Sequence, residues 1–176
     1  MNNISLSPHF SLEEFVKSST ARDHGINNTP PQEAVENLRA LCVHTLEPLR
    51  NALGLPIIVT SGYRCKALNH LLVNHSVKSQ HMNGQAADFY VAEPTDLNLE
   101  PGTLNPAKPI RRELLIKAFR QIITDDAIAF DQLIIYPSFI HVSYVRAGHK
   151  NRSKLTKAFA NGSYAALTRA QALSLE

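Results

Sequence analysis

Two histidines and one aspartate have the types and spacing expected of ligands for a divalent metal ion. His81 and Asp88 are seven positions apart, with His81 in a turn-rich stretch and Asp88 in the apolar segment that follows. His141 lies in a later β-branched segment, where a buried imidazole needs a hydrogen-bond partner or a metal. Catalytic zinc commonly takes three protein ligands and keeps one position for water. The trio is a candidate zinc site, although the residues alone also allow His141 to be a hydrogen-bonded core histidine.

The elements around these residues decide whether they can meet. Residues 86–91 alternate as a strand, which would put Ala86, Asp88 and Tyr90 on one face and the other three residues against the core. Gly84 allows the sharp turn that precedes this strand. Residues 132–136 and 139–145 are two further strand candidates, and their short connection demands an antiparallel hairpin. His141 would then lie in the second strand of that hairpin.

The remaining pattern predicts an α+β fold in which helices flank a small antiparallel sheet. A long amphipathic helix should begin near Gln32 and end at Gly54. Other helices are expected at 11–19, 66–73 and 110–123, a strand at 56–60, and a surface loop at 93–109. In the polar segment after residue 150, Ser163 could cap a short final helix.

Composition limits the class of protein. A chain of 176 residues suits one domain, and no apolar run approaches the ~20 residues that span a bilayer. The net charge of +3 is mild and its basic residues are scattered, which disfavours nucleic-acid binding. No signal peptide is seen at the start, so we expect synthesis in the cytoplasm. Cys42 and Cys65 are expected to be free thiols, with a disulfide between them as the alternative, and the protein is expected to be a monomer.

Several phrases of the sequence, taken together, resemble peptidase family M15. The most specific runs from Ser79 to Asp88 and contains Ser79-x-His81-x-x-Gly84-x-Ala86-x-Asp88. Ser61-Gly62-Tyr63-Arg64 precedes it, and Ile140-His141-Val142-Ser143 follows it. The short, single-domain branch of the family also carries phrases similar to residues 9–15 and 131–134. The resemblance spans about residues 7 to 150.

This resemblance implies a zinc peptidase that cuts bacterial peptidoglycan, as a D-Ala-D-Ala carboxypeptidase or an endolysin-type endopeptidase. It implies a hedgehog/D-Ala-D-Ala peptidase-like domain over residues 1–150, with 151–176 as a C-terminal tail. One Zn²⁺ would be held by His81, Asp88 and His141, and Arg64 would face the substrate carbonyl or carboxylate with Ser79 nearby. A structural salt bridge is the alternative role for Arg64. Such an enzyme would act on the wall once released, as a phage or prophage product would, and an internal recycling enzyme is the alternative.

The sequence departs from the family pattern at the general base. Better-known relatives carry a glutamate three residues before the last histidine, where this chain has Ser138. In the closer branch a glutamate often follows the Gln-Leu-Ile phrase, where the nearest residue here is Tyr136. Asp131 and Tyr136 are therefore the candidate catalytic residues beside Arg64, with a strand-start cap and packing as their alternative roles. The missing glutamate leaves a second function open, a zinc-retaining module that binds wall peptides without cutting them.

Overall fold

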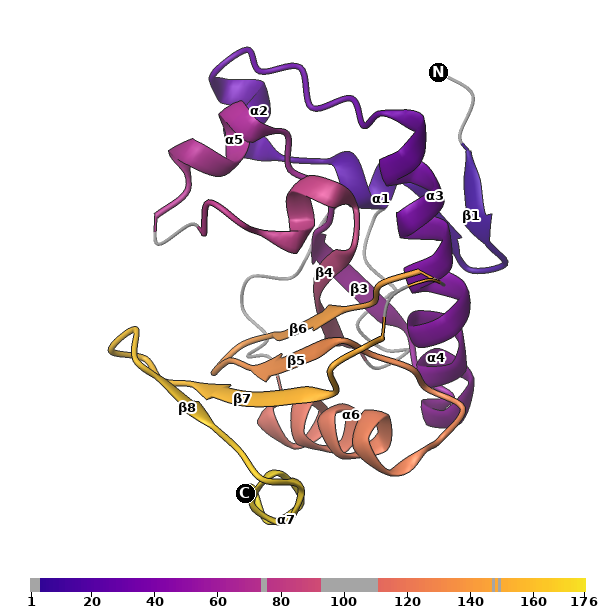
Figure 1. The fold of residues 1–176 in the computed structure, drawn as a ribbon, viewed down its shortest axis with the longest axis vertical. Coiled ribbons are helices and arrows are strands. Elements are labelled where there is room, and N and C mark those ends of the chain that lie inside the picture. Colours follow the sequence, from indigo (N-terminus) through magenta and orange to yellow (C-terminus); the bar gives the residue numbers. More distant parts are fainter. Residues whose placement is uncertain (1–3, 74–75, 93–110, 147, 149) are drawn as a thin grey trace.

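The computed structural model describes residues 4–73, 76–92, 111–146, 148 and 150–176 (Figure 1). Its main feature is a six-stranded sheet of order β3-β4-β6-β5-β7-β8. Every neighbouring pair is antiparallel except β5 and β7, which run parallel. The strands are β3 (Ile57–Ser61), β4 (Ala86–Val91), β5 (Gln132–Ile135), β6 (Ile140–Ser143), β7 (Lys154–Ala158) and β8 (Tyr164–Ala166). The expected α+β class is confirmed, with a mixed rather than purely antiparallel sheet.

Helices precede and flank this sheet. A two-stranded hairpin, β1 (Ser5–Ser7) and β2 (Phe10–Ser11), leads into α1 (Leu12–Val16) and α2 (Ser19–Asp23). The predicted long helix is confirmed as α3 (Gln32–Leu41) and α4 (Glu47–Leu53), joined end to end by the π-helical turn η1 (Cys42–Leu46) (Figure 1). It ends where Gly54 adopts a left-handed φ of 63°. The others are α5 (Lys66–Leu71), the 3₁₀ turn η2 (Gln80–Asn83), α6 (Arg112–Thr124) and α7 (Arg169–Leu173).

The core lies on one face of the sheet. Ala87, Phe89 and Val91 of β4 belong to it, as do Leu133 and Ile135 of β5. The buried side of α6 packs against this face, and α4 packs against α6. Burying a large apolar side chain such as Phe89 contributes about 1.5–3 kcal/mol. The alternation expected for β4 is therefore confirmed, and it turns Asp88 toward the opposite face.

The C-terminal segment continues the sheet. β7 pairs with β5, β8 pairs with β7, and α7 packs against α6. The division into a domain that ends at residue 150 and a tail stays a prediction, since the strand ladder runs across that position. The expected cap of the last helix was wrong. Ser163 precedes β8, whereas Thr168 caps α7 because its side chain accepts a hydrogen bond from the Gln171 amide.

Three further expectations have simple outcomes. Cys42 and Cys65 are both free. Within the described part of the chain, no helix has the length and apolarity to cross a membrane. The loop expected at 93–109 lies outside the described residues.

Two glycines with left-handed backbone allow a controlled test of how closely η2 approaches α3. Gly84 has φ of +67°, and a Cβ there would overlap main-chain atoms of Ala34, whereas Gly54 has φ of +63° and nothing within 4 Å of its Cβ position. We expect Gly54→Ala to cost about 1–2 kcal/mol from backbone strain alone. Gly84→Ala should cost at least about 3 kcal/mol, because steric overlap adds to the same strain. Urea unfolding of both variants measures the difference, and equal losses would contradict the close approach.

Candidate metal centre

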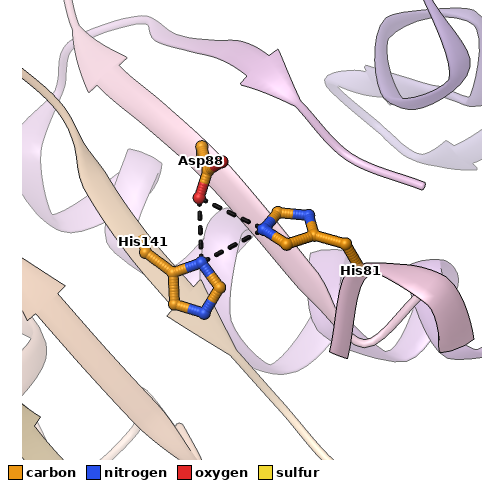
Figure 2. A group of neighbouring side chains, drawn as sticks. All are labelled: His81, Asp88 and His141. Carbon is orange, nitrogen blue, oxygen red and sulfur yellow. Dashed lines mark hydrogen bonds and ion pairs between the residues drawn. The ribbon is translucent and has the colours of Figure 1, made fainter. Parts of the chain in front are cut away.

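The register of the sheet brings the first two members of the trio together. Asp88 on β4 is directly opposite His141 on β6, so their side chains project from the same face. The Nδ1 atom of His141 lies 2.8 Å from Oδ1 of Asp88 (Figure 2). Two residues that are far apart in the chain thus become neighbours through strand pairing alone.

His81 reaches the same point from the turn η2. Its Nδ1 atom lies 2.7 Å from the carbonyl oxygen of Gly62. A carbonyl only accepts, so Nδ1 carries the proton and donates it, which leaves the lone pair of Nε2 free. Gly62 itself is pressed against Phe15, where an added Cβ would lie 2.6 Å from the Cα, Cβ and carbonyl oxygen atoms of that residue. Only glycine permits this approach, and the carbonyl that orients His81 depends on it.

The three ligand atoms have the separations that a small metal ion requires. Nε2 of His81 lies 3.2 Å from Nδ1 of His141 and 3.3 Å from Oδ1 of Asp88 (Figure 2). Donors at zinc distances of about 2.0–2.1 Å in a tetrahedron lie about 3.3 Å from one another. Two of the three pairs match that value, and the third needs to open by a few tenths of an ångström. Two imidazoles and one carboxylate form a donor set that suits zinc, so the residues present fit the ion.

The electrostatics of the site favour the protonation states that ligands need. Burial lowers the pKa of His81 below its ordinary value, against the opposing influence of the Asp88 charge. This histidine is therefore neutral at pH 7 and can offer a lone pair. Burial alone would raise the pKa of Asp88, but the two histidines lower it more strongly, and the net shift is downward. Asp88 is thus an ionised carboxylate in a nearly buried position.

Arg64 holds the other oxygen of the same carboxylate. Its Nη2 atom donates to Oδ2 of Asp88 at 2.6 Å, and its Nε atom donates to the Ser61 hydroxyl at 2.9 Å. Asp88 thereby keeps Oδ1 for the cluster while Oδ2 is occupied. This ion pair is what a structural role for Arg64 would require. The Arg64 side chain is 18% exposed, and its guanidinium has further N–H groups that these contacts do not use.

Asp131 does not join the cluster but is tied to the turn that carries His81. Its carboxylate accepts four hydrogen bonds from the main chain and guanidinium of Arg152, the Nε atom donating to both carboxylate oxygens. Gln80, the residue before His81, donates to Oδ2 of Asp131 at 2.9 Å. This environment gives Asp131 a positioning contact rather than a free carboxylate beside the ligand atoms.

The remaining predicted site residues are Ser79, two residues before His81, and Tyr136, five residues before His141. Tyr136 follows β5, two residues beyond Ile134, which is directly opposite His141. Burial raises the pKa of Tyr136 well above its ordinary value, and a hydrogen bond with Tyr164 adds to the shift. Its hydroxyl therefore stays protonated and cannot serve as a base at neutral pH. Ser79 is half-buried immediately before η2.

Sequence reasoning missed the residues that support the trio. Gly62 and Ser61 lie in a phrase that was noticed, but nothing in it indicated that a carbonyl would orient His81. Arg152 lies in a basic stretch, and nothing in the sequence there indicates that it pairs with Asp131. Tyr164 has no local signal at all, because it reaches Tyr136 only through the pairing of β8 with β7 and of β7 with β5.

The comparison with family models agrees with this geometry. A model described as Peptidase M15 matches residues 8–103, more than half of the chain. This chain belongs to peptidase family M15. The matched segment of this M15 peptidase contains Arg64, Ser79, His81 and Asp88, and ends before His141. No match was found among curated proteins. Family membership supports a peptidase, and a metal ion fits the cluster, the one such group among the described residues.

The pair formed by Asp131 and Arg152 can be tested through stability. Burial raises the pKa of Asp131, but the hydrogen bonds from Arg152 and Gln80 outweigh it, and the net pKa is lowered. Asp131→Asn should cost about 1–3 kcal/mol at pH 7, because Asp131 is buried while Arg152 is 57% exposed. A lowered pKa stabilises the fold above the unfolded value of about 3.9, so the loss should shrink as the pH falls below about 4.

The measurement is chemical unfolding of both proteins between pH 3 and 7. Asp126→Asn, at an exposed aspartate, is the matched control and should stay within about 0.5 kcal/mol of the unaltered protein. A difference between Asp131→Asn and the unaltered protein that does not vary with pH would rule out an ionised, paired Asp131.

Proposed function

We propose that this M15 peptidase is a zinc enzyme that hydrolyses peptide bonds in bacterial cell-wall peptidoglycan. The observation that carries the proposal is the convergence of the His81, Asp88 and His141 ligand atoms within 3.3 Å of one another. The substrate class comes from the motif resemblance, which includes both D-Ala-D-Ala carboxypeptidases and endolysin-type endopeptidases. Both readings use the same chemistry at the scissile amide.

The roles of the residues follow from their contacts. His81, Asp88 and His141 would hold the ion, with Gly62 and Arg64 fixing the orientation of the first two. Zinc in such a site lowers the pKa of water to about 7 and polarises a substrate carbonyl. Arg64 offers its unused N–H groups to a carbonyl or a C-terminal carboxylate, for which a planar cation with several donors is suited.

Tyr136 would donate a hydrogen bond to the reacting peptide. Its raised pKa keeps the hydroxyl protonated, and the charge of Asp88 contributes to that shift. A neutral donor stabilises negative charge that develops on a carbonyl oxygen. Asp131 would act at a distance, holding Gln80 and hence the turn that presents His81.

One observation favours a second candidate, a zinc-retaining module that binds wall peptides without cutting them. Family relatives place a glutamate where this chain has Ser138 or Tyr136, and the nearby Asp131 is bound to Arg152. A protein with the ion but no proton acceptor would retain binding and lose turnover. The two candidates therefore differ in product release and agree in metal dependence.

Hydrolysis of purified peptidoglycan by the metal-loaded protein separates them. We expect released peptide fragments, loss of release with a chelator, and recovery when zinc is restored. Fragment release should be abolished in each of the ligand variants His81→Ala, Asp88→Asn and His141→Ala. Each should also lower zinc affinity by more than the ~10–100-fold loss that follows removal of a residue that only hydrogen-bonds a ligand. His44→Ala is the control, because His44 stacks on Tyr144 and is not part of the cluster.

Retained binding to the wall without fragment release would favour the module. Fragment release that survives both the chelator and the His141→Ala change would contradict a zinc mechanism.

Arg64 has two roles that kinetics can distinguish. At saturating zinc, Arg64→Met should raise KM for a wall peptide by about 10-fold or more, because a charge-assisted hydrogen bond contributes about 1.5–3 kcal/mol. Arg146→Met, which removes a surface ion pair with Glu36, is the matched control. Weakened zinc binding with an unchanged KM would mean that Arg64 only orients Asp88.

A further inference from the structure

Three aromatic side chains form a cluster beside the candidate metal centre. The ring of Tyr136 stacks on Phe139, with centroids 4.2 Å apart and planes 12° from parallel. Tyr164 meets Tyr136 edge to face at a centroid distance of 6.1 Å. The stacking and the edge contact together leave the Tyr136 ring little freedom to turn.

Strand pairing locates this cluster relative to the ligands. Phe139 precedes His141 by two residues, and Tyr136 follows Ile134, the partner of His141, by two. Residues two apart on a strand share a face and lie about 7 Å apart. Both residues directly flank their strands, and the Tyr136 amide donates to the Phe139 carbonyl at 2.9 Å, so the pairing of β5 with β6 continues to them. The alternation therefore puts the Tyr136 and Phe139 rings beside His141 on the face of the sheet that bears the ligands, and Tyr164 joins them through Tyr136.

Tyr164 comes from a part of the chain that the family match does not include. It starts β8 at the free edge of the sheet and is 56% exposed. Its hydroxyl lies 3.2 Å from that of Tyr136, and either can be the donor. Two hydroxyls have two protons and use one of them in their shared bond, so each arrangement leaves one O–H free.

We propose that Tyr136 and Tyr164 act as one hydrogen-bonding unit that donates to a carbonyl oxygen of the bound peptide. The ribbon of β7 and β8 thereby completes the substrate site, with Tyr164 as a substrate-binding residue contributed from beyond residue 150. The inference rests on the proposed function, since the ligand is the peptide substrate of that reaction.

A double-mutant cycle tests the unit through binding. The probe is a phosphinate analogue of a D-alanine-containing stem peptide, which cannot be hydrolysed, titrated calorimetrically into the full zinc-loaded chain. Tyr136→Phe and Tyr164→Phe should each raise Kd about fivefold, the effect of losing one neutral hydrogen bond. The double variant should raise Kd by less than the product of the single effects, because the hydroxyls act together. Tyr144→Phe, whose ring stacks on His44, should bind as the unaltered protein does.

The outcomes separate this inference from the proposed function. Single effects that multiply, an unchanged Kd for Tyr164→Phe, or no binding of the analogue would overturn the hydrogen-bonding unit. If the Kd values follow the expected double-mutant cycle but peptidoglycan is not hydrolysed, the hydrogen-bonding unit is supported and only the proposed peptidase activity is contradicted. Thermal unfolding of each variant confirms that it is folded, and Tyr164→Ala, which also removes the ring contact, should bind no more tightly than Tyr164→Phe.

Discussion

The candidate site depends on keeping three polar groups close together in a place with little water. Asp88 and His81 are buried, and His141 is only 12% exposed in its side chain. Polar groups in such positions are costly unless each finds a partner. Strand register supplies the first contact, between Asp88 and His141, and the Gly62 carbonyl supplies the orientation of His81. The pairing of the strands and the packing of the segments beside them therefore offset the free-energy cost of burying these three polar groups.

The support around the ligands comes from segments that are distant in sequence. Arg64, three residues after β3, holds the outer oxygen of Asp88, and the hydroxyl of Ser61 at the end of β3 accepts a hydrogen bond from the Arg64 guanidinium. Arg152, between β6 and β7, binds Asp131, which in turn binds Gln80 on the turn that carries His81. The segment after residue 150 thus supports the turn that carries His81 through this chain of contacts, and it places Tyr164 against Tyr136.

Local periodicity was enough to predict the two strands that carry Asp88 and His141. Alternation in residues 86–91 placed Asp88 away from the core, and the short link at Pro137-Ser138 predicted the hairpin that holds His141. It could not predict that β7 pairs with β5 in parallel, because strand order depends on packing of the whole chain. Asp131 was considered for catalysis for the same reason. No local sequence pattern indicates that Arg152, 21 residues later, forms an ion pair with it.

The sheet of this M15 peptidase has the core on one face and the candidate metal centre on the other. The most direct test of that arrangement is a crystal structure of the zinc-loaded protein with anomalous data at the zinc absorption edge. One anomalous peak is expected about 2.0–2.2 Å from Nε2 of His81, Oδ1 of Asp88 and Nδ1 of His141. A zinc ion bound elsewhere, or no peak at these three atoms, would contradict the assignment of the centre.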